Sequence, residues 1–381
     1  MRIGIDIISL QNNSQNRGIG TFTRCLIKSI LTIDRENEYV FFVFGNRPLP
    51  PLVKEELFKD IRIRKVIPLR KRFSWLSGQF LFPLAIKEEK VDIFHSPEYI
   101  LPAFSKCKKI ITIHDFINSD YKIYRKRSNF IRKTYFYLKN ETLKRADKII
   151  AVSEYTKKKI MEFLGIEEER IKVIYEAADE IFIPLNDNAL FSKLRNKYGI
   201  ERDFLLFPGV IDHHKNIDGL IRAFSQARFK DIGLVLAGAK SDDVRYFRFI
   251  KALIERLGIK DRVYILGYIP PGEDLVGLYN MAKIVISVSF YEGFGLPILE
   301  AMACGRPVIA SGNTSMREIV GSCGVLVDPH NNEEIASAID NLLSDENLRK
   351  LLSKRGLARA KEFSWEKTAK ETLSLYENLL E

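Results

Sequence analysis

The segment Ser287–Glu300 has the sequence SVSFYEGFGLPILE and carries the most informative pattern of the chain. We expect a strand to end near Val288, a loop to present Glu292, and a helix to start at Pro297 and carry Glu300, because proline favours the first helical turn. Carboxylates accept hydrogen bonds from sugar or ribose hydroxyls, and the amides of a glycine loop can bind an anion. For an isolated pair of glutamates, a helix cap beside a surface glutamate is the simpler alternative.

Apolar, β-rich runs alternate with amphipathic runs along the chain, a pattern typical of βαβ units and parallel sheets. A polar, irregular segment at 177–188 interrupts this alternation. We therefore predict an α/β fold with Rossmann-like domains at residues 1–180 and 181–366, and a final helix at 367–381 that crosses back to the first domain. The expected strands are Ile3–Ile8, Tyr39–Phe44, Arg62–Ile67, Val91–His95, Ile110–Ile113, Lys148–Val152, Phe204–Phe207, Gly233–Ala237, Val263–Leu266, Ile284–Val288, Pro307–Ala310 and Gly324–Val327.

Length and composition agree with this organisation. A chain of 381 residues is too long for one ordinary core and suits two α/β domains. The four cysteines, Cys25, Cys107, Cys304 and Cys323, form no CxxC pair, which argues against a disulfide framework or a cysteine zinc site. No signal-peptide pattern is found, and the longest uncharged run, Phe73–Ile86, is too short for a bilayer span. We therefore expect a cytoplasmic protein without a transmembrane helix.

The charge balance points to an anionic partner. The chain has 60 Lys and Arg against 49 Asp and Glu, for a formal charge of +11. Residues 121–145 combine many Lys and Arg with aromatic residues and contain one acid, Glu141. This stretch is typical of a surface that binds anionic lipid head groups on the inner face of a membrane, and a solvated helix with aromatics turned inward is the alternative. Nucleic acid is disfavoured because no binding module accompanies the charge.

Each predicted domain opens with a strand, a glycine turn and a helix. The first turn contains Gly18 and Gly20, and the second contains Gly209. The first turn lacks the third glycine of a dinucleotide fingerprint and a well-placed acid about 20 residues further on, which disfavours NAD binding. A glycine turn before a helix still allows close backbone approach and offers a positive helix N-terminus, so either half could hold a diphosphate.

The segment with the two glutamates resembles the signature of the retaining GT-B glycosyltransferases of family GT4, in which a Glu-x7-Glu pair flanks a Gly-Phe-Gly-Leu-Pro loop. The resemblance extends in the family's order over nearly the whole chain. It includes the glycine loop at 17–22, Ile113-His114-Asp115, the segment at 146–154, and the turn from Gly209 to Lys215-Asn216. It implies a GT-B fold, with two facing Rossmann-like domains and a deep interdomain cleft, in which the C-terminal domain holds a nucleotide sugar and the N-terminal domain holds an acceptor.

The same resemblance implies roles for individual residues. Lys215 would face the donor diphosphate, where a cation offsets the charge of the leaving group. Glu300 resembles the ribose-binding carboxylate of the family, and Glu292 the carboxylate near the hydroxyls of the transferred sugar. His114 would lie beside the donor sugar, with a satisfied core histidine as the alternative. The expected catalytic residues are His114, Lys215 and Glu292, and the expected donor-binding residues are Gly18, Gly20, Gly209, His214, Lys215, Tyr268, Glu292, Gly293, Phe294, Gly295, Leu296 and Glu300.

One position departs from the family pattern. Many relatives carry an arginine just before the Lys-Asn pair, whereas this chain has His214. A histidine is mostly neutral near pH 7 and lacks the bidentate fork of an arginine. Lys215 with the helix N-terminus, or another cation such as Arg17, would then have to hold the second phosphate.

The family resemblance also implies the chemistry. It implies transfer of a hexose with retained anomeric configuration, no enzyme nucleophile, no cofactor and no metal. The sequence has no HExxH motif, and Asp242-Asp243 is more typical of a turn than of a metal clamp. Resemblance to subgroups with the Lys-Asn turn favours mannose as the sugar and a glycan or lipid-linked acceptor. Other nucleotide-sugar chemistry, such as epimerisation or sugar-phosphate synthesis, and a catalytically idle binding protein are the alternatives.

Overall fold

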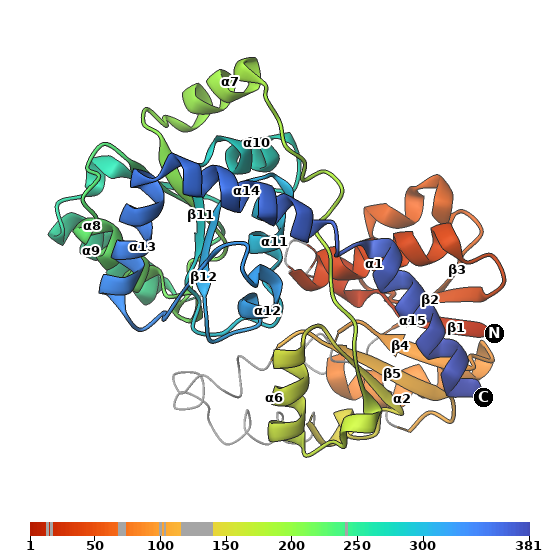
Figure 1. The fold of residues 1–381 in the computed structure, drawn as a ribbon. Coiled ribbons are helices and arrows are strands. Elements are labelled where there is room, and N and C mark those ends of the chain that lie inside the picture. The colour runs from red at the N-terminus through yellow and green to blue at the C-terminus, as the bar shows by residue number, and fades with distance from the viewer. Residues whose placement is uncertain are drawn as a thin grey trace. The chain divides into compact units, whose positions relative to one another are not determined.

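The computed structural model describes residues 1–381 except 13–14, 16–17, 68–73, 99–100, 103, 116–139 and 241–242, and for 74–78 it describes the backbone alone. The described chain divides into two compact units (Figure 1). Unit 1 comprises Met1–Glu176 and Ser364–Glu381, and unit 2 comprises Ala177–Phe363. These boundaries lie a few residues before those expected at 180/181 and 366/367.

Unit 1 is built on a seven-stranded parallel sheet with the strand order β3-β2-β1-β4-β5-β6-β7. The five inner strands are mostly buried runs rich in Ile, Val and Phe, as expected for a parallel sheet covered on both faces, whereas the edge strands β3 and β7 are partly exposed. The strands are β1 Arg2–Asp6, β2 Glu38–Phe44, β3 Arg62–Val66, β4 Ile93–Ser96, β5 Lys108–Ile113, β6 Lys148–Ala151 and β7 Ile171–Val173. The helices are α1 Gly18–Ile33, α2 Ser74–Glu88, α6 Glu154–Leu164 and α15 Trp365–Leu380, with 3₁₀ turns at Ile8–Gln11, Pro51–Lys54, Glu56–Phe58 and Glu168–Arg170.

Unit 2 repeats this architecture with a six-stranded parallel sheet of order β10-β9-β8-β11-β12-β13. Its strands are β8 Phe204–Pro208, β9 Gly233–Ala237, β10 Val263–Gly267, β11 Ile284–Ser287, β12 Val308–Ser311 and β13 Val325–Val327. Its helices are α7 Asn188–Tyr198, α8 Ile217–Gln226, α9 Val244–Arg256, α10 Glu273–Met281, α11 Leu296–Ala303, α12 Met316–Val320, α13 Asn332–Ser344 and α14 Glu346–Ala360, with 3₁₀ turns at His213–Lys215 and Lys260–Arg262. Each strand expected from the sequence has a counterpart, and β7 is an additional strand.

The C-terminal helix α15 belongs to unit 1, where it packs against α1. The Thr368 hydroxyl donates a hydrogen bond of 2.7 Å to the carbonyl oxygen of Tyr175. At the other end of the helix, the Tyr376 hydroxyl lies 2.6 Å from Nδ1 of His95, a buried residue of β4. Burial and the neighbouring His114 lower the pKa of His95 to about 3, so its ring is neutral. These contacts attach α15 to the sheet of unit 1.

The first glycine turn differs from the expectation. Gly18 and Gly20 lie in the first turn of α1 and not in a loop before it. Gly20 is buried, so the absence of a side chain there permits close packing of the helix. Arg17, named as an alternative phosphate ligand, lies outside the described residues.

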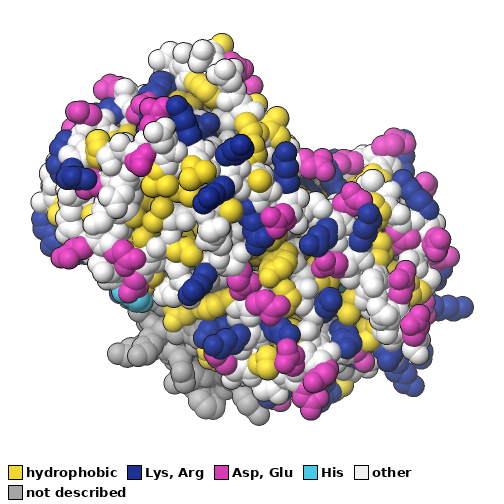
Figure 2. Space-filling view, viewed as in Figure 1, with side chains coloured by type: hydrophobic (Ala, Val, Ile, Leu, Met, Phe, Trp, Pro, Cys, Tyr) yellow, Lys and Arg dark blue, Asp and Glu magenta, His cyan; other side chains and the backbone are white. Residues whose placement is uncertain are grey.

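The basic segment at 121–145 is described only from residue 140 onward, so residues 121–139 lie outside the described part. Over the described residues of the face in Figure 2, Lys and Arg side chains are interspersed with Asp and Glu side chains. Among the described helices, none has the length and apolar character needed to cross a bilayer.

Candidate active site

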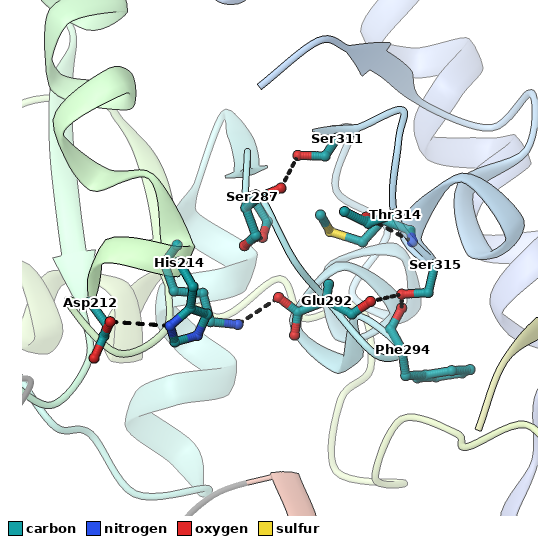
Figure 3. Close-up of polar contacts among 11 residues, drawn as sticks. Asp212, His214, Ser287, Glu292, Phe294, Ser311, Thr314 and Ser315 are labelled. Atoms are coloured by element: carbon teal, nitrogen blue, oxygen red, sulfur yellow. Dashed lines mark hydrogen bonds and ion pairs between the residues drawn. The ribbon is translucent and has the colours of Figure 1, made fainter. Parts of the chain in front are cut away.

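The candidate site lies in unit 2, where β8, β11 and β12 are neighbours in the sheet. The carboxyl ends of parallel strands meet at one edge of a sheet, and ligands of such sheets bind at that edge. Three segments leave the sheet there: the turn 209–216 after β8, the loop 288–295 after β11, and the segment 312–316 after β12. Figure 3 shows polar side chains from all three segments turned toward one another.

The turn 209–216 is shaped by close backbone approach and by one left-handed residue. A Cβ added at Gly238 would lie 1.6 Å from the carbonyl oxygen of Gly209, so the chain after β9 can approach this turn only as glycine. Asn216 has φ of +54°, a conformation that asparagine tolerates better than most residues. Its side-chain amide donates to the carbonyl oxygen of Pro329 at 2.6 Å. These constraints fix the backbone that carries Lys215.

Lys215 and Glu292 meet across two neighbouring strand ends. The distance from Nζ of Lys215 to Oε2 of Glu292 is 2.6 Å, and the side chains are only 14% and 15% exposed. Burial weakens solvent screening, so this contact is stronger than a surface ion pair. The structure therefore brings together a cation and a carboxylate that lie 77 residues apart in the sequence.

Two further contacts hold the loop 288–295. The backbone amide of Phe290 donates to the carbonyl oxygen of His214 at 2.8 Å, which joins this loop to the turn after β8. The hydroxyl of Ser315 lies 2.8 Å from the carbonyl oxygen of Glu292 and 2.9 Å from that of Phe294 (Figure 3). A hydroxyl has one proton, so Ser315 shares it between the two acceptors. Because the carbonyl oxygens of Glu292 and Phe294 both face Ser315, the backbone of the loop between them is held in place.

Gly295 ends the loop and is the N-cap of α11, with φ of +111°. A Cβ there would lie 2.8 Å from Cγ of Met316. Positive φ at a non-glycine residue costs about 1 to 3 kcal/mol, so we expect Gly295→Ala to lower the free energy of unfolding by about that amount and to reduce turnover by displacing the loop. Urea unfolding and initial rates measure the two effects.

Gly312→Ala is the matched control for this substitution. Gly312 follows β12 at the same sheet edge, has no positive φ, and an added Cβ would meet its nearest neighbour at 3.6 Å, an ordinary contact. An equal loss of stability and turnover in both variants would contradict the special role given to the backbone of Gly295.

The helix α11 begins at Leu296 and has Pro297 in its first turn, as expected from the sequence. Its N-terminus carries the partial positive charge of a helix end next to the loop. Glu300 follows in the second turn, and its Oε2 accepts a 2.6 Å hydrogen bond from the hydroxyl of Tyr279 on α10. Burial raises the pKa of Glu300 to about 7, although the Tyr279 hydrogen bond opposes this shift.

The side chains of two predicted donor-site residues, His214 and Tyr268, have surroundings of their own. The ring of His214 is buried, and its Nδ1 lies 3.2 Å from Oδ1 of Asp212 (Figure 3). The ring therefore already has a partner within its own turn. Tyr268 follows β10, the edge strand that β9 separates from β8. Tyr268 is 42% exposed. It follows β10, whereas Lys215 follows β8.

The predicted residues of unit 1 form their own group at the carboxyl edge of that sheet. His114 directly follows β5, with Nδ1 2.9 Å from Oε1 of Glu176 and Nε2 3.0 Å from the carbonyl oxygen of Pro97. Phe22 of α1, the helix that contains Gly18 and Gly20, packs edge-on against the His114 ring with 4.7 Å between centroids. Burial alone would lower the pKa of His114, but the hydrogen bond and charge of Glu176 outweigh burial and raise it. The ring thus faces two acceptors and favours the imidazolium form.

In the part of the chain that the structure describes, no group of three or more His, Cys, Asp or Glu side chains is arranged to hold a metal ion. The polar residues at the strand ends of unit 2 are instead a lysine, isolated carboxylates and hydroxyls. This set can bind an anion through Lys215 and the α11 N-terminus, and hydroxyl groups through Glu292 and Glu300.

Sequence reasoning missed three residues that shape these groups: Tyr279, Ser315 and Glu176. Ser315 could have been found because it follows a predicted strand, β12, at the same edge as the glutamates. Tyr279 carried no such signal, since it lies within a helix and its partner Glu300 is 21 residues away.

Solved structures share this architecture over the whole chain. Sucrose-phosphate synthase from Thermosynechococcus elongatus superposes with a TM-score of 0.79 at 22% identity, over 100% of this chain and 99% of that one. HepE of Anabaena, solved with UDP-glucose, superposes with a TM-score of 0.78 at 19% identity, over 99% and 100% of the two chains. These similarities confirm the predicted GT-B fold. Two Rossmann-like units of this kind define the class of protein by its fold, GT-B.

The chain belongs to glycosyltransferase family 4, which confirms the resemblance drawn from its sequence motifs. Residues 18–180 match the model described as Glycosyltransferase Family 4, and residues 191–359 match the model described as Glycosyl transferases group 1. O-antigen chain mannosyltransferase B of Escherichia coli is 33% identical over 380 residues, which cover 95% of this chain and 96% of that protein.

Proposed function

We propose that this glycosyltransferase transfers mannose from GDP-mannose to a glycan or lipid-linked acceptor, with retention of anomeric configuration and without a metal ion. The main support for a donor site is the 2.6 Å contact between Lys215 and Glu292 after the ends of two neighbouring strands. The mannosyl donor is supported by the name of the Escherichia coli relative and by the Lys215-Asn216 turn.

In the proposed reaction, the donor diphosphate takes the place beside Lys215 that Glu292 occupies in the free protein. Lys215 and the N-terminus of α11 offset the charge that grows on the diphosphate as the bond from the sugar C1 to its oxygen breaks. Glu292 then accepts hydrogen bonds from sugar hydroxyls. The acceptor oxygen forms the new bond to C1 on the same face, and its proton passes to the departing diphosphate. No enzyme group forms a covalent bond to the sugar.

We assign the acceptor to unit 1, where His114 and Glu176 lie at the carboxyl edge of the sheet. The basic, aromatic segment at 121–145 supports a peripheral location on the inner face of a membrane, because anionic head groups would attract its Lys and Arg residues.

The test begins with thermal unfolding in the presence of GDP, UDP, ADP and their common sugar derivatives. A ligand at 100 times its Kd stabilises the folded state by about 2.7 kcal/mol, so the correct donor should give the largest shift. We expect GDP and GDP-mannose to give that shift, and GDP release to require a glycan acceptor and to persist in EDTA. Stabilisation by GDP-mannose without acceptor-dependent release would indicate an idle binding protein, and no stabilisation by any nucleotide would overturn the donor site.

The configuration of the product is read by NMR of the anomeric proton. An α-mannoside from GDP-α-mannose supports retention, whereas a β-mannoside contradicts it.

A further inference from the structure

Tyr279 is a fully buried tyrosine whose hydroxyl is directed at one carboxylate. Its relative exposure is 0%, and its hydroxyl lies 2.6 Å from Oε2 of Glu300. Among the described residues, no donor reaches the other oxygen, Oε1 of Glu300. The carboxylate is therefore held by one oxygen and has the second available for a ligand.

The position of Tyr279 is fixed from its other side. Phe182 packs edge-on against the Tyr279 ring, with 5.3 Å between centroids. The neighbouring Asn280 accepts from the backbone amide of Leu185 at 2.8 Å and donates to the carbonyl oxygen of Ile183 at 3.0 Å. Helix α10 and the segment 182–185 are thus tied together, so the tyrosine hydroxyl has little freedom to leave Glu300.

The surroundings of Glu300 contain few groups that favour its charge. Tyr279 of α10 faces it with a hydrogen bond, and Asp179, from the segment after β7, adds a like charge. Cys304, which directly follows α11, is a neutral thiol, since burial and Glu300 raise its pKa to about 12, and Arg306 interacts with that thiol. The Tyr279 hydroxyl is thus the contact that favours the ionised carboxylate.

We propose that Tyr279 is a positioning residue of the nucleotide site: its hydroxyl holds Oε2 of Glu300 so that Oε1 accepts a hydrogen bond from a ribose hydroxyl of the bound nucleotide. The proposal rests on the donor site proposed above, which places a nucleoside diphosphate at this edge of unit 2. It adds the specific claim that a residue with no ligand contact of its own sets the affinity for ribose.

The proposal has a pH signature. Glu300 has a pKa of about 7 in the free protein, so its ionised fraction, and with it the affinity for a ribose hydroxyl, rises from pH 6 to pH 8. The Tyr279 hydrogen bond lowers that pKa, so Tyr279→Phe should move the midpoint of the affinity profile to higher pH. A tyrosine that only fills space would leave the midpoint unchanged.

Calorimetric titration with GDP and UDP, and with their 2′,3′-dideoxy analogues, tests the proposal between pH 6 and 8. Tyr279→Phe should weaken the better ribonucleotide about 5- to 10-fold at pH 7, the scale of losing one ordinary hydrogen bond. The dideoxy analogue should bind both proteins alike. Glu300→Gln should abolish the pH dependence of the difference in affinity between the ribonucleotide and its dideoxy analogue, which cancels the titration of the phosphate itself. Adding Tyr279→Phe to that variant should have a much smaller effect than in the wild type.

Tyr198→Phe is the matched control, because the Tyr198 hydroxyl also donates to a carboxylate of unit 2, that of Asp274, at the surface. Its nucleotide affinity should equal that of the wild type. Circular dichroism verifies that each variant is folded, and should Tyr279→Phe fail to fold, the pH profile of Glu300→Gln decides. If the difference in affinity between ribonucleotide and dideoxy analogue still depends on pH in Glu300→Gln, the inference is overturned.

Two other outcomes separate the inference from the proposed function. The role of Tyr279 is overturned, and the donor site left intact, by either of two results. One is wild-type affinity with an unshifted midpoint in Tyr279→Phe, and the other is equal weakening of ribo- and dideoxynucleotide binding in that variant. If the wild-type protein binds neither GDP nor UDP, the donor site itself is wrong and the inference falls with it.

Discussion

Replacing Lys215 with alanine is expected to lower turnover by about 10²- to 10³-fold, the usual cost of removing one preorganised group that stabilises developing charge. Lys215 is the cation at the carboxyl end of β8, and its side chain is largely buried against Glu292. Its loss removes the charge that offsets the leaving diphosphate and leaves Glu292 partly buried without its cation. Both effects disfavour a bound diphosphate, so nucleotide affinity should fall as well.

Initial rates with the donor identified by thermal unfolding, together with the Kd for the nucleoside diphosphate, measure this prediction. Lys193→Ala is the matched control, since Lys193 forms an exposed ion pair with Glu273 elsewhere in unit 2. It should change neither quantity, because exposed pairs contribute little. If Lys215→Ala retained more than about a tenth of the wild-type rate, the electrostatic role would be too small for the proposed step.

The sequence predicted the sheets well because their strands are buried on both faces. Such strands are short runs of Ile, Val and Phe between turn residues, and this pattern is local. The strand β7 was missed because it has only three residues, Ile171–Val173, directly after the polar turn Glu168–Arg170. The glycines of α1 were misplaced because Gly18 and Gly20 break a local rule: glycine disfavours a helix, yet packing overrides that preference here.

The sequence names individual residues of the candidate site but not the contacts between them. The strand-end rule and the family motif both point to Lys215, Glu292 and Glu300. Neither indicates that the first two form an ion pair, nor that Ser315 holds the glycine loop. These contacts join segments from different strands, and side-chain pairing over such sequence distances depends on the packed fold and not on any local pattern.

The second large effect concerns Glu292. We expect Glu292→Gln to lower turnover about 10- to 100-fold with a smaller change in Kd for the nucleoside diphosphate, because a hydrogen bond to a charged group contributes about 1.5 to 3 kcal/mol. A free nucleoside diphosphate carries no sugar, so it lacks the hydroxyls that would donate hydrogen bonds to Glu292. Removing the carboxylate even frees Lys215 from its partner, which favours the diphosphate.

Glu300→Ala should behave in the opposite way. The alanine removes the carboxylate that Tyr279 holds, so nucleotide affinity should fall while the rate at saturating donor changes less. The two variants are compared by measuring kcat and the nucleotide Kd for each. Identical changes of kcat and Kd in the two variants would contradict the assignment of Glu292 to the transferred sugar and of Glu300 to the ribose.

The ion pair between Glu292 and Lys215 predicts that substitutions of the two residues affect nucleotide binding in a coupled way. In the free protein each neutralises the other, so the site attracts an anion weakly until the diphosphate displaces the carboxylate. The double variant Lys215→Ala with Glu292→Gln should therefore bind nucleoside diphosphate no more weakly than Lys215→Ala alone, because Glu292 then repels the diphosphate without compensation. If Glu292→Gln changed the affinity by the same factor with Lys215 present and with alanine in its place, the 2.6 Å contact of the free protein would have no part in donor binding. A non-additive result would instead make this ion pair the element that the donor must open, and it would explain why a lysine and a glutamate from two different strand ends are kept within reach of each other.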